Sequence, residues 1–229
     1  MKTLTKIISS GLLIAVPVIF SSCSSSGEAK ENPVESPLKM SASAVELKTD
    51  MRKLWVDHVV WTRNVELCII DDLGGKTQVV DRLMKNQDQI GNAMKTYYGE
   101  IAGKQLTDLL RTHISIAAEF LQNTKKGDQK ASDESNKKWY KNAEEISEFL
   151  SKANPVNWKM DEMKMMMNNH LKLTTDEAMA RKNKNYDADV EAFDKTQNEI
   201  LKMADMLTDG ILKQFPDKFK EMMVPSEKM

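Results

Sequence analysis

Residues 54–61 read LWVDHVVW, and two later stretches repeat their pattern: residues 109–116, LLRTHISI, and residues 166–173, MMNNHLKL. In each stretch an apolar residue lies four positions before a histidine, and further apolar residues lie one and three positions after it. The chain has three histidines, one in each stretch: His58, His113 and His170. They are separated by 55 and 57 residues, a period that fits a helical hairpin with its loops. The sequence therefore predicts one hairpin repeated three times.

From residue 43 onward the hydrophobic pattern is helical almost throughout, with apolar residues three and four positions apart. Short polar segments containing glycine, asparagine or proline interrupt this pattern. We predict six amphipathic helices, at residues 43–72, 77–98, 104–125, 130–153, 158–182 and 187–214. Short connections make neighbouring helices antiparallel. The predicted fold is all-α, a single six-helix bundle of three repeated antiparallel helical hairpins.

The second helix of each predicted hairpin carries a polar residue on its inward stripe: Asn86, Asn142 and Thr196. Together with the three histidines, these side chains predict a buried polar layer near the middle of the bundle. An unpaired buried polar group costs about 1–3 kcal/mol, so the members must bond to one another, to water or to a ligand. The first interpretation is a satisfied hydrogen-bond layer that fixes the register of the hairpins.

A metal site is the alternative interpretation of this layer. The neutral imidazoles of His58, His113 and His170 would converge from three helices. Glu177 lies seven residues after His170, two turns along the same helix face. However, none of the histidines has a glutamate three residues before it, as di-iron bundles require, and no two histidines have the HExxH spacing. We expect no cofactor, with a divalent metal bound by His58, His113, His170 and Glu177 as the alternative.

The N-terminus has the pattern of a bacterial lipoprotein signal peptide. Lys2 and Lys6 precede an apolar stretch at residues 7–20, and Cys23 follows two serines. This resembles a lipobox, with Phe20 where leucine is usual. We predict a signal peptide at residues 1–22, a lipidated (palmitate-carrying) Cys23, a flexible tether at residues 23–42, a bundle at residues 43–219 and a frayed tail at residues 220–229. An ordinary secretion signal that leaves Cys23 unmodified is the alternative.

This organisation predicts a cell-envelope protein, lipid-anchored to a bacterial membrane and facing the periplasm or the cell surface; the leaflet stays open. Cys68 then becomes the only free thiol, and its apolar surroundings predict a buried, inert side chain. The 16 methionines, five of them within residues 160–167, are interpreted as core filling. Thioether ligands for Cu(I) are the alternative for that run.

Composition excludes several classes of function. The chain has 33 Lys and Arg residues against 34 Asp and Glu residues, so it lacks the basic surface that nucleic-acid binding requires. At 41% hydrophobic residues it is too apolar for a disordered chain. It has no phosphate-binding loop, no dinucleotide fingerprint, no serine elbow and no paired-cysteine zinc motif. Catalysis is therefore not the expected activity.

Residues 54–63, LWVDHVVWTR, resemble the opening of a family of uncharacterised bacterial helical-bundle proteins. The likeness continues through residues 89–93, 97–99, 138–143 and 203–207, and it spans about residues 52–219. Members often carry names such as glycosyltransferase or acetylglutamate kinase, which an all-helical chain of this size does not support. Asp57-His58 also resembles, distantly, the ferritin-like bundles. We therefore expect a lipid-anchored, extracytoplasmic binding or interaction module with an unknown protein or small-molecule partner, and a ferritin-like metal-binding protein as the alternative.

Overall fold

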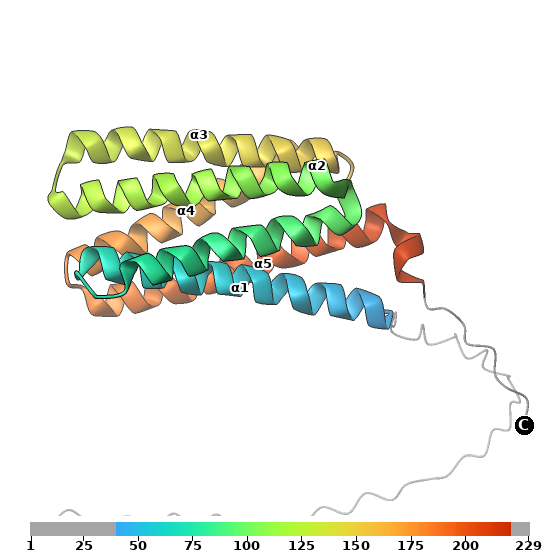
Figure 1. The fold of residues 1–229 in the computed structure, drawn as a ribbon, viewed down its shortest axis with the longest axis horizontal. Helices are drawn as coiled ribbons and strands as arrows, with labels where there is room; N and C mark the ends of the chain where they lie inside the picture. The colour runs from blue at the N-terminus through green and yellow to red at the C-terminus, as the bar shows by residue number, and fades with distance from the viewer. Residues whose placement is uncertain (1–39, 221–229) are drawn as a thin grey trace, which may run out of the picture. The chain divides into compact units, whose positions relative to one another are not determined.

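The computed structural model describes residues 40–220, which form five α-helices and one short 3-10 helix (Figure 1). The helices are α1 (Ala42–Ile70), α2 (Lys76–Lys126), α3 (Gln129–Ala153), α4 (Met160–Lys182) and α5 (Tyr186–Gln214), followed by η1 (Pro216–Phe219). No strand occurs among these described residues. The all-α prediction is confirmed, whereas the count is five helices where the sequence predicts six.

The difference in count arises at Gly99, inside α2. Gly99 has φ 87° and ψ 170°, a conformation that is essentially restricted to glycine. Residues on both sides of Gly99 are helical, so the predicted second and third helices are counted together as α2, although the helical conformation is broken at Gly99. Its two halves run in opposite directions (Figure 1). The break was predicted in the right place, but a single residue makes the turn.

Two other glycines let the halves of α2 approach closely. A Cβ atom on Gly91 would lie 2.7 Å from the carbonyl oxygen of Gly103, and one on Gly103 would lie 2.8 Å from the carbonyl oxygen of Gly91. Any side chain at either position would force the halves apart. Gly103 was predicted to belong to the turn, but it is helical and serves this crossing instead.

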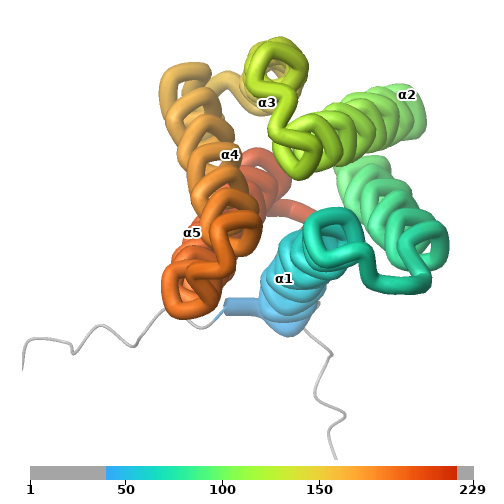
Figure 2. Tube along the Cα trace, turned by 90° about the vertical axis from the view of Figure 1, so that its left-hand side faces the viewer, coloured from blue at the N-terminus to red at the C-terminus, as the bar shows by residue number. Residues whose placement is uncertain are grey.

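The helices surround one core, which Figure 2 shows end-on. Each helix packs against the next in the chain, and α1 also packs against α5, which closes the arrangement. Met163, Met166 and Met167 are buried in this core, as core filling requires, while Met165 is 69% exposed. Cys68 is a buried free thiol, as predicted.

Helix α1 starts one residue before its predicted boundary. The hydroxyl of Ser41 caps the helix by accepting a hydrogen bond from the backbone N–H of Ala44 at 3.2 Å. The predicted signal peptide, Cys23, most of the tether and residues 221–229 of the tail lie outside the described residues. Of the helices in residues 40–220, none combines the length and the apolar character that a membrane span needs.

Candidate functional site

His113, on α2, lies at the centre of a hydrogen-bond chain that engages both of its ring nitrogens. The indole N–H of Trp139 donates to His113 Nε2 at 2.9 Å, and His113 Nδ1 lies 2.7 Å from Asn142 Oδ1. An indole nitrogen can only donate, so Nε2 accepts and Nδ1 carries the proton. The amide of Asn142 is oriented by a bond from its Nδ2 to the carbonyl of Leu109 at 3.3 Å. A metal could reach His113 only by breaking one of these bonds.

Burial sets the charge of His113. The ring is 2% exposed, and desolvation, followed by repulsion from His170, lowers its pKa to about 3. Hydrogen bonding to Asn142 opposes this shift only in part. His113 is therefore neutral at physiological pH, and its role is to join α2 to α3.

His58, on α1, is also neutral and buried. Gln87 Nε2 lies 3.3 Å from His58 Nδ1 and also donates to the carbonyl of Leu83 at 2.9 Å. Because that nitrogen is a donor, Nδ1 accepts and the proton of the ring lies on Nε2. Desolvation, with repulsion from His170 and His113, holds the pKa of His58 well below its usual value.

His170, on α4, differs from the other two histidines in lacking a hydrogen bond at Nδ1. Glu199 Oε2 lies 3.3 Å from His170 Nδ1, yet the alignment makes no hydrogen bond and both atoms have no partner. The rings of His170 and His58 have their centroids 5.7 Å apart. The structure thus brings these two histidines together, while His113 is held by its own partners.

A common spacing relates the three histidines to their neighbours. In each case Nδ1 faces a side-chain polar group 29 residues later, on Gln87, Asn142 or Glu199. The predicted polar layer is buried, but of Asn86, Asn142 and Thr196 only Asn142 forms a hydrogen bond to a histidine. Asn86 donates to the backbone carbonyl of Leu54 at 3.0 Å, and Thr196 donates to the carbonyl of Ala192 at 3.0 Å.

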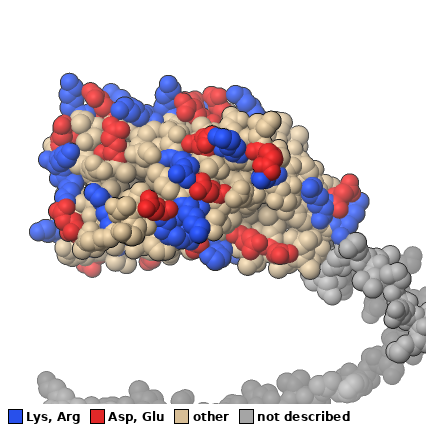
Figure 3. All heavy atoms as spheres, in the orientation of Figure 1, with Lys and Arg blue, Asp and Glu red and all other residues tan. Residues whose placement is uncertain are grey.

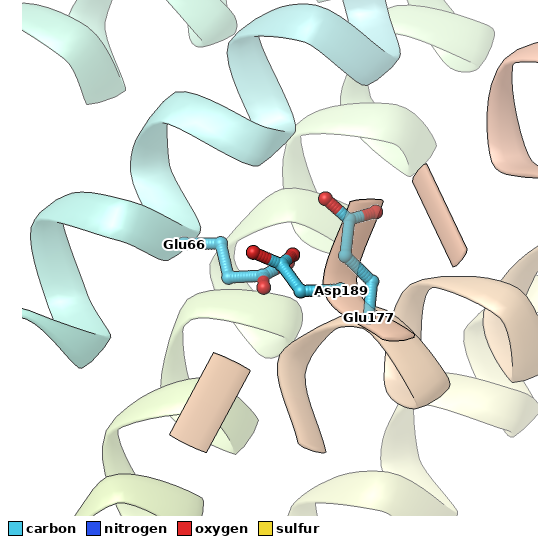
Figure 4. Close-up of side chains that lie close together, drawn as sticks. All are labelled: Glu66, Glu177 and Asp189. Atoms are coloured by element: carbon cyan, nitrogen blue, oxygen red, sulfur yellow. The ribbon is translucent and has the colours of Figure 1, made fainter. Parts of the chain in front are cut away.

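Glu177, the predicted fourth ligand, belongs to a second cluster at the end of the bundle that holds the α4–α5 turn. Figure 4 shows Glu66, Glu177 and Asp189 converging from α1, α4 and α5. One oxygen of each lies within 4.8 Å of the other two. All three side chains are buried, with exposures of 0%, 2% and 1%. We call this set the acidic cluster.

Two arginines contact the acidic cluster from its solvent side. Arg63 holds Asp189 with two bonds of 2.8 and 3.0 Å and also donates to Glu177. Arg181 donates to Asp189 at 3.1 Å and to Asp71 at 2.8 Å. These bonds satisfy Asp189 fully and Glu177 in part.

Glu66 is the exception within the acidic cluster. Neither of its oxygens has a hydrogen-bond partner. Burial, and then repulsion by Glu177, raise the pKa of Glu66 well above its usual value. Burial likewise raises the pKa of Glu177 to about 7, against the opposing hydrogen bond from Arg63. Glu66 and Glu177 therefore bind a proton at higher pH than ordinary glutamates do.

Glu66 could have been found from the sequence, because it follows His58 by eight residues as Glu177 follows His170 by seven. Both spacings place an acid about two turns beyond the histidine. The contributions of Arg63, Arg181 and Asp189 had no comparable signal, since they depend on how α1, α4 and α5 meet.

The surface of the bundle carries both signs of charge, interspersed on the face that Figure 3 shows. A groove of about 650 Å³ lies between α1, α2 and η1 and is lined by apolar and acidic side chains that include Leu47, Met51 and Asp50. None of the three histidines lines this groove. The sequence resemblance to bacterial helical bundles stays a prediction. Comparison of the chain with protein-family models, with curated proteins and with solved structures gave no match.

Proposed function

We propose that this protein is a lipid-anchored component of the bacterial cell envelope whose bundle, built from three related hairpins, acts as a binding or interaction module. The observation that carries the proposal is the burial of the three histidines. His58, His113 and His170 are at most 4% exposed, and His113 has both ring nitrogens bonded to protein groups. Histidines held in this way serve the specificity of packing rather than proton transfer to a substrate.

The lipid anchor is tested by replacing the predicted acylation site. Cys23→Ser should move the protein from the membrane fraction to the soluble fraction, because the acyl chains on Cys23 are the only membrane anchor that we propose. Cys68→Ser is the matched control, since it removes the only other thiol and should leave the protein in membranes. Membrane association that survives Cys23→Ser would overturn the anchor.

A second candidate function, transition-metal binding, is favoured by the unpartnered pair His170 Nδ1 and Glu199 Oε2. A neutral imidazole nitrogen and a carboxylate oxygen are common ligands of such metals. Two donors that share one metal at about 2.1 Å lie roughly 3 Å apart, and these atoms are 3.3 Å apart. The ring of His58 neighbours that of His170, and His58 would supply a third ligand on giving up its bond from Gln87.

Metal analysis of protein purified without a chelator or an affinity tag tests this candidate. Stoichiometric metal that is lost in His170→Gln and retained in His113→Gln would establish a metal-binding function for the histidine layer. His113→Gln is the matched control because the bonds of His113 leave it no free nitrogen. Metal-free protein, or metal unaffected by His170→Gln, would exclude this second function.

A further inference from the structure

The acidic cluster is built differently from an ordinary buried ion-pair network. In such networks every carboxylate finds a donor, because an unpaired buried charge is strongly destabilising. Asp189 and Glu177 follow that rule through Arg63 and Arg181. Glu66 does not: it is fully buried, both of its oxygens lack a partner, and one of them points into the space shared with Glu177 and Asp189.

The charges of the cluster leave a deficit of two positive charges. Four carboxyl groups lie in one connected set: Glu66, Glu177, Asp189 and Asp71. Arg63 and Arg181 are the guanidinium groups that contact them. Fully ionised, the set therefore carries a net charge of about −2. Three of its four carboxyls are buried, where a low dielectric constant makes such a charge unfavourable, while Asp71 is exposed. A single divalent cation would make the set neutral.

We propose that Glu66, Glu177 and Asp189 form a binding site for a hard divalent cation, Ca²⁺ or Mn²⁺. The donors are all carboxylate oxygens, which such cations prefer. Three oxygens spread evenly around a Ca²⁺ ion at about 2.6 Å lie about 4.5 Å from one another, so atoms within 4.8 Å of one another fit around one ion with little movement. Mg²⁺ fits less well, because it retains several waters and these side chains are enclosed.

Arg63 and Arg181 do not block the proposed cation site. Each carboxylate oxygen can accept more than one bond, so Arg63 and Arg181 can hold Glu177 and Asp189 from the outside while the cation takes the inner lone pairs. Such outer partners fix the orientation of ligands. The site lies near the surface, since Arg63 and Arg181 have side-chain exposures of 16% and 22%, and a cation would enter past them.

This site is distinct from the histidine layer, and its test separates the two. Chelator-stripped protein is titrated with CaCl₂ and, separately, with MnCl₂ by isothermal calorimetry, and thermal unfolding is followed by circular dichroism with and without each salt. We expect saturable one-site binding of at least one cation and a higher midpoint of unfolding in its presence. Absence of both heat and stabilisation at millimolar Ca²⁺ and Mn²⁺ would overturn the proposal.

Glu66→Gln is the decisive variant, because Glu66 accepts no hydrogen bond that the substitution could break. It should weaken cation binding by at least about 10–100-fold and leave the metal-free protein folded. Glu145→Gln is the control, because it removes the same charge from an exposed glutamate of α3 that belongs neither to the acidic cluster nor to the histidine layer, and its affinity should stay within a few-fold of the parent.

Two outcomes would refute the assignment to the acidic cluster. Binding unchanged in Glu66→Gln would remove the site from this cluster, and binding abolished equally by Glu199→Gln would move it to the histidine layer. Should Glu66→Gln fail to fold by circular dichroism, Glu177→Gln tests a second ligand, and an affinity equal to that of the parent would again refute the site.

Discussion

Acidification should destabilise the bundle through His113 by an amount that follows from its surroundings. The folded protein holds the pKa of His113 at about 3, whereas the unfolded chain has the ordinary value of 6.5. Below pH 6.5 His113 therefore binds a proton in the unfolded chain but not in the folded protein. Stability is fully present above pH 6.5 and is lost as the pH falls toward 3, by about 1.4 kcal/mol per unit.

Between about pH 7 and pH 5, this difference amounts to roughly 2 kcal/mol for His113 alone. The measurement compares urea unfolding of the parent and of His113→Gln at both pH values, in buffer with a chelator so that no cation contributes. Other buried groups titrate in both proteins, including Glu66, whose raised pKa acts with the opposite sign. Their effects cancel in the comparison.

The parent should therefore lose about 2 kcal/mol more than His113→Gln on acidification. His113→Gln will start from a lower stability at neutral pH, because the bonds from Trp139 and to Asn142 are lost or weakened, and only the change with pH is diagnostic. An equal loss in the two proteins would refute the reasoning, since it would show that His113 titrates normally in the folded state.

Three further predictions concern the backbone and the thiol. Gly99→Ala should lower the free energy of unfolding by about 1–3 kcal/mol, because φ 87° is strained for alanine; Gly74→Ala, in open space and without a positive φ, is the control that should change little. Gly210→Ala should destabilise by about 3 kcal/mol or more in denaturant titrations, since its Cβ would lie 2.0 Å from Nε1 of the fully buried Trp158; a loss below about 0.5 kcal/mol would contradict this packing. Cys68 should react with a thiol reagent slowly in native protein and quickly in denaturant, and equal rates would show that the site opens freely.

The helical class was predictable because it rests on local signals. Hydrophobic periodicity and short polar breaks recur along the whole domain, and the predicted break near Gly99 is where the chain turns. The sequence could not show that one glycine suffices for the turn. Such a tight turn requires the two halves of α2 to approach closely, which they do at Gly91 and Gly103, where neither residue has a side chain. The sequence of one half alone does not show which residues of the other half it will contact.

The sequence predicted which residue types form the candidate site, but it predicted less well which residues are their hydrogen-bond and ion-pair partners. Burial of the histidines followed from their place on the apolar stripes. The polar residue opposite His58 is Gln87 rather than Asn86, a shift of one position that depends on the axial rotation of a helix. Asp189 and Arg63 came together only through tertiary packing, since their helices are far apart in the chain.

The order in which the helices pack has a consequence for how the chain folds. Helices that follow one another in sequence are neighbours in space, so these contacts form across short loops at low entropic cost. The packing of α1 against α5 is different, because it joins the two ends of the domain. We expect hairpins to assemble early and the α1–α5 seam to close last. The acidic cluster, which draws on α1, α4 and α5, would then be completed only in the final step of folding.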